Sequence, residues 1–333
     1  MELISYIILI CFSALSILTE SKLFYKWIFI PSVLVFMIII RSAGFDLDLE
    51  TYALEMRGNL YTTDLYYLRE FVFWLGSRLV YYLFQDEFIS FLFMDCIWII
   101  TILKVGNRMA LFKKENLNNA LLVILMTSFP FVFGYENIYR QFYATVFALF
   151  SYSLISESYK KSLFFFVIAF FMHNTVVLLI PLYVVKKLYR FNFSGRIQIS
   201  FLITFLIIAS LGILENWKSV EQTGIEMGLF YFLFFFILLV IGLIFFKHNI
   251  YMLFNKVPSL FFIVIIMFGL ISLDADMIAE RIGMMCISFL TYDLYKYSSE
   301  IEDRGIRSIL RLSLMLLFTL PTLFFESSRQ FLM

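Results

Sequence analysis

The chain has 333 residues, of which 62% are hydrophobic and only 15% are charged. Soluble domains contain about 45–50% apolar and about 25% charged residues, so most of this protein's surface is expected to face lipid. The formal net charge of +1 and the lack of a basic tract exclude a nucleic-acid-binding protein. The composition therefore predicts an all-α polytopic membrane protein, because only helices and closed barrels satisfy their backbone groups in lipid.

Long apolar runs follow one another along the chain. The first run, 3–18, lacks a basic leader and a small-residue cleavage site, so it predicts a retained span and not a signal peptide. A complete span needs about 20 apolar residues, and the sequence predicts about twelve transmembrane helices, some of them short or re-entrant. Because no linker or repeat interrupts the chain, residues 1–333 are expected to form a single integral membrane domain. The spans are expected at 3–19, 27–40, 88–104, 119–133, 138–156, 162–172, 174–185, 197–214, 228–246, 258–273, 282–297 and 308–324.

Short basic loops follow every second predicted span, and such loops lie in the cytoplasm. The intervening loops are poor in lysine and carry most of the polar chemistry. The sequence therefore predicts a multi-pass inner-membrane protein whose polar chemistry lies on the outer side. The basic loops contain Lys104, Arg108, Lys113 and Lys114, then Lys160 and Lys161, Lys186, Lys187, Arg190 and Arg196, Lys247 and Lys256, and finally Lys296, Arg304 and Arg307.

Residues 66–84 are apolar enough to form another span, but a span here would move the basic loop at 104–114 to the outside. The charge bias favours a helix that lies on the outer surface, with Arg69 and Arg78 both near water. A true span is the alternative. With the surface helix, the first large outer loop runs from Arg41 to Glu87.

The outer loop at 41–87 is rich in carboxylates. Asp46 and Asp48 come first after the second span, so they should lie nearest the membrane. A carboxylate at the edge of a low-dielectric cleft can act as a general base towards an acceptor hydroxyl. The plainer alternative for each is a solvated acidic loop, and a spacing of two residues is weak support for a divalent cation.

Arg140 stands at the outer start of an apolar helix, beside Gln141. An arginine near the bilayer is costly without a partner, and its planar fork of donors suits phosphate or carboxylate. The sequence predicts an anion-binding role for Arg140. The alternative is a structural salt bridge to Glu136, four residues earlier on the same helix.

His173 and Asn174 interrupt an apolar stretch between two basic pairs. Only 24 residues separate Lys161 from Lys186, too few for two full spans. Two short helices are therefore expected to meet at His173, and broken helices at that depth occur where they line a protein-buried or wet cavity. A role in such a cavity competes with that of an ordinary packed histidine.

Arg281 opens a second apolar helix from the predicted outer side, next to Glu280. Nearby carboxylates could satisfy it structurally. Alternatively Arg140, Arg281 and His173, with Lys218 as an addition, form a cationic floor for which a diphosphate is a natural ligand.

Several motifs are absent from the sequence. There is no Walker A sequence, no GxGxxG that opens a helix, no HExxH and no GxSxG elbow, which argues against ATP-driven transport, protease and serine-hydrolase chemistry. The three cysteines, Cys11, Cys96 and Cys286, lie in apolar runs without metal-ligand spacing. No metal and no cofactor are expected, since two arginines can replace a metal at a diphosphate.

The stretch NIYRQFYATVFALFSYSLISESYKKSLFFFVIAFFMHNTVVLLIPLYVV resembles the signature of EpsG/Wzy-type polysaccharide polymerases. In that family an Arg-Gln pair opens one helix, a basic cytoplasmic turn follows, and the next apolar helix ends in histidine. Gly44, Asp46 and Tyr52 upstream, and the stretch Glu280–Gly283 downstream, are similar in order and spacing. The resemblance covers about residues 40 to 300.

The resemblance implies a GT-C-like membrane glycosyltransferase that polymerises undecaprenyl-diphosphate-linked oligosaccharide repeats into O-antigen, capsular polysaccharide or exopolysaccharide. Its active site would lie on the outer face of the bacterial inner membrane. The loop at 41–87 is similar to the first outer loop that supplies the catalytic carboxylate in GT-C enzymes. The implied partners are the lipid-linked oligosaccharide and membrane lipid, with a chain-length regulator as a further candidate. The implied catalytic residues are Asp46, Asp48 and His173, the diphosphate ligands are Arg140, Arg281 and Gln141, and the supporting residues are Glu136, Glu280 and Tyr52.

Two other classes remain open. A glycolipid flippase or secondary transporter also uses broken helices and intramembrane charge, although here the charges gather on one predicted side and no internal repeat is visible. A membrane acyltransferase would pair a histidine with Asp or Asn, which His173 and Asn174 support only weakly.

Overall fold

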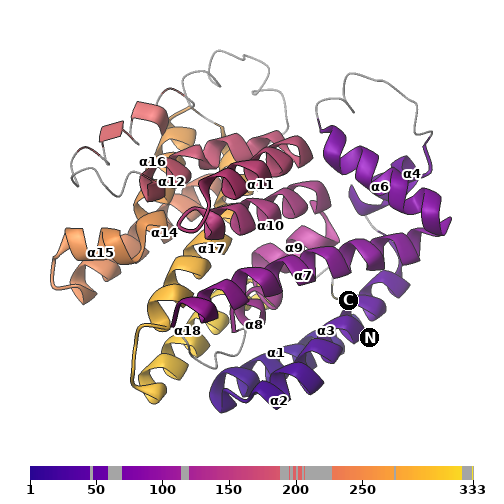
Figure 1. Ribbon diagram of the computed structural model, residues 1–333, viewed down its shortest axis with the longest axis horizontal. Coiled ribbons are helices and arrows are strands. Elements are labelled where there is room, and N and C mark those ends of the chain that lie inside the picture. Colours follow the sequence, from indigo (N-terminus) through magenta and orange to yellow (C-terminus); the bar gives the residue numbers. More distant parts are fainter. Residues whose placement is uncertain are drawn as a thin grey trace. The chain divides into compact units, whose positions relative to one another are not determined.

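The computed structural model describes residues 1–45, 48–58, 70–113, 120–187, 195, 198–199, 202–204, 206, 227–273, 275–324 and 332. Every element in these ranges is a helix, which confirms the all-α class (Figure 1). The chain forms two compact units, one of Met1–Ser153, Lys160–Asn174 and Ser298–Met333, the other of Leu154–Tyr159 and Thr175–Tyr297. We describe each unit by itself, and the single domain over 1–333 stays a prediction.

Apart from single residues at helix ends, each element belongs to one unit. The first unit contains α1 (Glu2–Thr19), α2 (Lys22–Phe24), the π-helix η1 (Tyr25–Phe29), α3 (Ile30–Ala43), α4 (Asp48–Met56), α6 (Phe71–Phe84), α7 (Glu87–Lys113), α8 (Ala120–Met126), α9 (Phe129–Glu136), α10 (Tyr139–Leu154), α11 (Tyr159–Met172) and α18 (Arg304–Phe324). The second contains the 3₁₀-helix η2 (Asn174–Leu179), α12 (Ile180–Lys187), α14 (Met227–Phe245), α15 (Ile250–Lys256), α16 (Pro258–Ser272) and α17 (Asp276–Ser298).

The lengths and compositions of the described helices are those of a multi-pass membrane protein. Besides the five candidate spans named at the end of this paragraph, α15 and α16 could together form a sixth, although they meet at a bend of 97°. The other predicted spans that fall on described residues form shorter or more polar helices, so a total of about twelve stays a prediction. Within the described residues, five helices are long and apolar enough to cross a bilayer: Glu2–Thr19, Lys22–Ala43, Glu87–Asn107, Gly228–Phe245 and Arg304–Phe324.

The helix predicted at 119–133 is broken into α8 and α9, so the prediction of one continuous span is wrong here. Pro130 explains the break, because continuing α8 through it would leave the Met126 carbonyl without a helical donor and bring the proline ring against that carbonyl. Pro130 lies instead in the first turn of α9, where its missing N–H needs no partner. Ser128 is extended, with φ −73° and ψ 145°. The carbonyl exposed at the break is satisfied, since the Tyr6 hydroxyl donates to Thr127 O over 2.5 Å.

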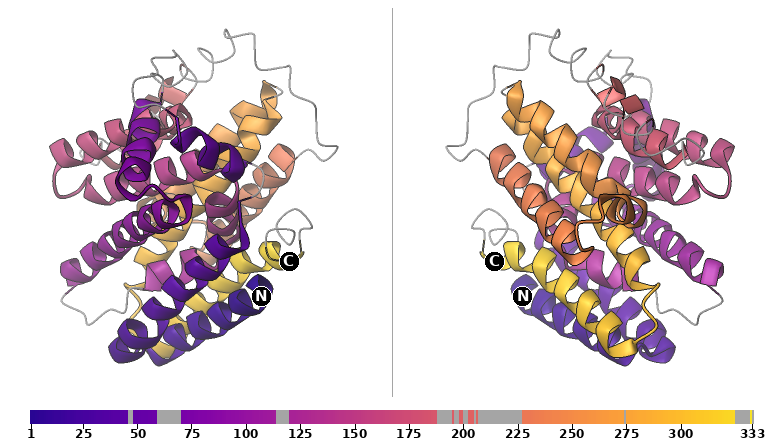
Figure 2. Two further views of the ribbon diagram at one scale, coloured as in Figure 1. Left: turned by 90° about the vertical axis from the view of Figure 1, so that its right-hand side faces the viewer. Right: turned by 90° about the vertical axis from the view of Figure 1, so that its left-hand side faces the viewer.

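The first and last long helices pack together in the first unit, antiparallel to one another (Figure 2). The Arg304 guanidinium at the start of α18 donates to Thr19 O at the end of α1, over 2.7 Å. Arg307 forms two hydrogen bonds of 2.9 Å with the Glu20 carboxylate. Burial raises the pKa of Glu20, but the hydrogen bond and charge of Arg307, together with the charges of Arg311 and Arg304, outweigh burial and lower that pKa below its ordinary 4.5.

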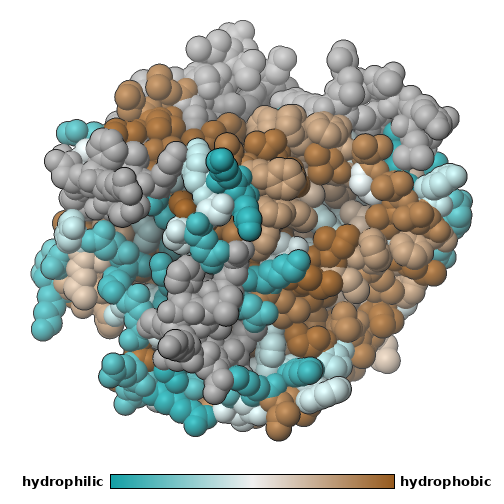
Figure 3. All heavy atoms as spheres, in the orientation of Figure 1, coloured by the Kyte–Doolittle hydropathy of each residue, from teal (hydrophilic) through white to brown (hydrophobic). Residues whose placement is uncertain are grey.

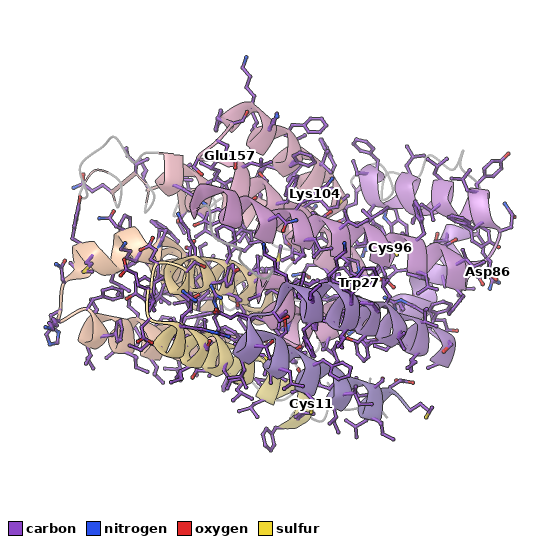
Figure 4. The ribbon with its side chains drawn as sticks, turned by 60° about the horizontal axis from the view of Figure 1, so that its bottom comes forward. Cys11, Trp27, Asp86, Cys96, Lys104 and Glu157 are labelled. Atoms are coloured by element: carbon purple, nitrogen blue, oxygen red, sulfur yellow. The ribbon has the colours of Figure 1, made fainter. Side chains whose placement is uncertain are left out.

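α7 carries charge towards both ends of an apolar segment. Asp86 immediately precedes α7, and Cys96 and Lys104 follow along the helix (Figure 4). The eighteen-residue interval from Asp86 to Lys104 is about 27 Å long, close to the thickness of a hydrocarbon core of about 30 Å. The outer faces of α3 and α7 are apolar, as lipid contact requires (Figure 3), and their exposed side chains include Leu34, Val35, Ile38, Ile89, Phe93 and Ile100.

The predicted segment 66–84 contains the helix α6, and whether it lies on the outer surface or spans the membrane stays a prediction. Arg69 lies outside the described residues. The expectation that Arg78 lies near water is wrong, because its side chain is only 5% exposed and pairs with Glu55 at 3.4 Å. Arg78 also donates through Nε to Glu55 O over 3.2 Å. The exposed residues of α6 include instead the apolar Leu75, Leu79 and Leu83.

The second unit contains its own buried polar contacts. Asp293 of α17 accepts a hydrogen bond of 3.0 Å from the backbone N–H of Ser259, in the first turn of α16. This bond satisfies one of the helix-start donors that have no partner within the helix. The ammonium of Lys186, at the end of α12, lies 5.0 Å from the ring centroid of Tyr292. Lys186 also lies close enough to Asp293 of α17 for their charges to interact.

Candidate functional site

Glu70 links two of the residues that the sequence singles out. Its Oε2 accepts a hydrogen bond of 2.5 Å from Nη1 of Arg140. Its Oε1 lies 3.9 Å from Nε2 of His173. The exposed fractions of the Glu70, Arg140 and His173 side chains are only 9%, 16% and 10%, so these groups interact in a medium of low dielectric. All three belong to the first unit, although they lie far apart in the sequence.

Arg140 is positioned by a break between two helices. α9 ends at Glu136, Asn137 has φ −129° and ψ −71°, and α10 begins at Tyr139. Arg140 therefore lies in the first turn of α10. The predicted helix does not continue from Glu136 to Arg140, and Arg140 forms an ion pair with Glu70, seventy residues earlier. The local salt bridge considered as the alternative assumed one helix through Glu136 and Arg140, and the structure has a break between them.

Two aromatic rings support the Arg140 guanidinium. Its central carbon lies 5.4 Å from the ring centroid of Tyr52 on α4 and 5.0 Å from that of Trp74 on α6. The two rings pack edge to face, with centroids 6.0 Å apart. Cation–π contacts of this kind hold a guanidinium in place and leave its edge available for anions. The predicted supporting residue Tyr52 is thus part of the site.

His173 lies where a helix is broken, as predicted. α11 ends at Met172, and the 3₁₀-helix η2 begins at Asn174. The backbone N–H of His173 donates to Ala169 O over 3.0 Å, which is the last helical hydrogen bond of α11. The imidazole is thereby held at the helix end, towards Glu70.

A buried ionic cluster fixes the start of α10 next to Arg140. Arg41 of α3 binds Asp95 of α7 through Nε over 2.8 Å and through Nη2 over 3.1 Å. Asp95 Oδ1 also accepts hydrogen bonds from the Tyr139 hydroxyl at 2.8 Å and from Trp98 Nε1 at 2.9 Å. A buried ion pair with additional hydrogen bonds holds its partners in one geometry. Tyr139, the residue before Arg140, is therefore anchored to α3 and α7.

The remaining predicted residues of the first unit are near the site or not described. Asp46 lies outside the described residues. Asp48 is exposed in the first turn of α4, four residues before Tyr52. Gln141 is buried beside Arg140. Glu136, at the end of α9, is partly buried and interacts electrostatically with Arg41.

Glu280 and Arg281 belong to the second unit, whereas Arg140 and His173 belong to the first, so their place in a common site stays a prediction. Both lie on α17, and Arg281 is half-buried. Two residues later, Gly283 allows close packing, since a Cβ there would lie 2.6 Å from Cγ of Tyr231 on α14. Predicted as parts of the diphosphate site, Glu280 and Arg281 thus occupy a stretch that also serves helix packing.

Sequence reasoning did not select Glu70, Arg41 or Asp95. Glu70 was only one of eight carboxylates in the 41–87 loop, and no local spacing distinguished it. Asp95 had a clear signal, because it is the single charged residue within the apolar segment 88–103. An ionisable residue inside a span is costly and marks a polar network by default.

The cluster of Arg140, Glu70 and His173 combines an anion-binding fork, a carboxylate and an imidazole. Such a set can bind a phosphate group and can accept or donate a proton. No group of three or more His, Cys, Asp or Glu residues that could hold a metal ion occurs within the described ranges.

Comparisons with known proteins give one match. The family model described as "EpsG family" matches residues 24–331, which is nearly the whole chain. Neither the curated proteins nor the solved structures contain a match. The matched range includes the Arg140–Glu70–His173 cluster and the Arg41–Asp95 pair. The chain therefore belongs to the EpsG family, whose members are Wzy-type polysaccharide polymerases.

Proposed function

We propose that this EpsG-family polymerase joins oligosaccharide repeats carried on undecaprenyl diphosphate, at the outer face of the bacterial inner membrane. The single observation that carries the proposal is the ion pair of Arg140 with Glu70, beside His173 and over two aromatic rings. A mostly buried arginine with a fixed plane at a helix start is a preformed ligand for a phosphate group.

The proposed reaction is an inverting glycosyl transfer that needs no nucleotide sugar. An acceptor hydroxyl at the non-reducing end of one lipid-linked repeat attacks the anomeric carbon of the growing chain. The bond from that carbon to the diphosphate oxygen breaks, and the diphosphate keeps the electron pair. The hydroxyl proton passes to a base, for which Asp46, Asp48 and His173 are the candidates.

Arg140 would act on the leaving group. Negative charge develops on the bridging oxygen as the sugar–diphosphate bond breaks, and a fixed guanidinium stabilises that charge more in the transition state than in the ground state. Arg281 and Gln141 are proposed as further diphosphate ligands.

The proposed outer-face location rests on charge. Lys104 and the basic residues after it mark one end of α7 as cytoplasmic, whereas the acidic pair Asp86 and Glu87 precedes the apolar segment at its other end. Glu70 and α6 come before that acidic end in the chain, on the side predicted to face outward.

The test uses purified protein in nanodiscs with undecaprenyl-diphosphate-linked repeats and no energy source. We expect a ladder of longer glycans, read by gel electrophoresis, together with release of undecaprenyl diphosphate. Translocation of the repeat without any new glycosidic bond would support the flippase alternative and refute polymerisation.

A further inference from the structure

We propose that Glu70 is a specificity-determining residue. Its carboxylate binds the Arg140 guanidinium and thereby excludes singly charged phosphodiester lipids, and only a diphosphate displaces it. This inference rests on the proposed function and adds a selection step to it. The problem that it addresses is physical. A site for a lipid diphosphate in a membrane is surrounded by a large excess of lipids whose head groups also carry phosphate.

The first argument is geometric. Nη1 of Arg140 donates to Oε2 of Glu70 over 2.5 Å, the same kind of short charge-assisted bond that the guanidinium would make to a phosphate oxygen. A carboxylate and a phosphate compete for one fork of donors. A ligand that uses this edge of Arg140 must therefore displace Glu70 or share the guanidinium with it.

The second argument is charge balance. Arg140 and Glu70 neutralise each other, and both side chains are mostly buried. A phosphodiester with one negative charge would replace one carboxylate by one phosphate and gain little. A diphosphate diester carries two negative charges and several more acceptor oxygens, so it can gain contacts that the carboxylate does not make. Selection by a built-in competitor is a form of discrimination against the wrong ligand.

The third argument concerns what remains after displacement. The guanidinium of Arg140 stays over the rings of Tyr52 and Trp74, at 5.4 Å and 5.0 Å from their centroids. The displaced carboxylate already has His173 on its other side, with Nε2 3.9 Å from Oε1. Glu70 can thus shift towards the imidazole without being left buried and alone, which would be costly.

The experiment measures binding of farnesyl diphosphate to the full-length protein in phosphatidylcholine nanodiscs, with and without added phosphatidylglycerol. For the wild type we expect measurable binding that phosphatidylglycerol hardly changes. For Glu70→Gln we expect binding about tenfold tighter, a difference of about 1.4 kcal/mol. Added phosphatidylglycerol should also clearly weaken the binding of farnesyl diphosphate to this variant, because the Glu70 carboxylate that excluded this lipid from Arg140 is no longer present.

Two further variants keep the test decisive. Glu70→Asp retains the charge but withdraws it by one methylene, so its affinity should fall between those of the wild type and Glu70→Gln. Glu87→Gln is the matched control, since Glu87 also pairs with an arginine, Arg57, whose side chain is 55% exposed. Glu87→Gln should behave like the wild type, and size-exclusion profiles confirm that each variant is folded.

The outcomes separate this inference from the function on which it rests. If the wild type binds farnesyl diphosphate, Arg140→Ala does not, and Glu70 variants bind no tighter and remain insensitive to phosphatidylglycerol, the selection role is refuted and diphosphate binding stands. If the folded wild type does not bind farnesyl diphosphate at all, the proposed function fails and the inference fails with it.

Discussion

The hydroxyl of Tyr139 donates a hydrogen bond of 2.8 Å to Oδ1 of Asp95, the carboxylate that also binds Arg41. Through this bond the buried ionic cluster of α3 and α7 holds the first residue of α10. The next residue, Arg140, turns to Glu70 and the aromatic rings. A structural network and the candidate site are therefore adjacent in the chain, and variants can separate their roles.

Arg140→Ala should reduce polymerisation by about a hundred- to a thousandfold, because a charge-assisted contact made mainly in the transition state contributes about 2.7–4 kcal/mol. Arg140→Lys should restore activity only in part, since it keeps the charge but loses the two-pronged geometry. Glycan chain length and protein abundance are measured together. The double variant Arg140→Ala with Glu70→Gln removes the unpaired carboxylate, so it should restore any lost abundance but not activity. Restored activity would show that the pair is only structural.

Asp95→Ala should destabilise the protein by about 3–5 kcal/mol, because it leaves Arg41 charged and buried without its partner. The double variant Arg41→Met with Asp95→Leu should be less harmful than the single change, since it removes both charges. Thermal unfolding in detergent, followed by size-exclusion fluorescence, measures both. Arg57→Gln is the matched control, because Arg57 pairs with Glu87 through a side chain that is 55% exposed, and it should leave the unfolding temperature unchanged.

The contact between α1 and α18 should weaken in acid. The pKa of Glu20 is lowered in the folded protein, so its stabilising contribution is complete above about pH 4.5 and is lost as the pH falls through the folded value. Unfolding temperatures measured from pH 6 down to pH 3 should show this decline. Glu20→Gln removes the titrating group, so the unfolding temperature of the variant should be lower at pH 6 and should fall less on acidification than that of the wild type. Parallel pH profiles for both proteins would contradict the assignment.

Gly283→Ala should destabilise the second unit by about 1–3 kcal/mol, because the new methyl group overpacks against Tyr231. Shortening the partner in Gly283→Ala with Tyr231→Val should recover part of the loss. Gly76→Ala on α6 is the control, since nothing lies within 4 Å of its Cβ position and alanine is the better helix former. Destabilisation by Gly76→Ala as large as by Gly283→Ala would refute the packing argument.

Labelling of introduced cysteines tests the topology predicted from the basic loops. In a parent with Cys11, Cys96 and Cys286 replaced by serine, Asp86→Cys should react with an impermeant maleimide added to intact cells. Lys104→Cys should react only after permeabilisation, because the apolar segment between the two positions crosses the hydrocarbon core. Labelling of both positions from the same side would show that α7 does not span the membrane. Labelling of Asp86→Cys only from inside would reverse the proposed orientation.

Much of the fold could be predicted from the sequence, because lipid imposes a simple rule on composition. Long apolar runs such as 3–19 and 228–246 became α1 and α14 within a residue or two. The break at Pro130 was missed because hydropathy alone does not report how proline interrupts a helix. The burial of Arg78 was missed because it depends on Glu55, which lies 23 residues away.

The site was predicted in part for the same reason. Arg140 and His173 were selected because polar residues at helix starts and helix breaks are conspicuous in apolar sequence. Their common partner Glu70 could not be identified, since it lies among other loop carboxylates and its contacts span 70 and 103 residues of chain. The partner of Arg140 depends on tertiary contacts that no local pattern encodes.

The ion pairs between Glu20 and the first turns of α18 have a consequence for biosynthesis. Arg307 lies 287 residues after Glu20, so the ribosome must synthesise α18 before α1 and Glu20 can pack against it. Contacts of such high sequence separation form late and slow folding. The membrane-inserted N-terminal helices should therefore wait in an incompletely packed state, open to quality-control proteases. A stop codon before residue 304 would leave that intermediate as the end product.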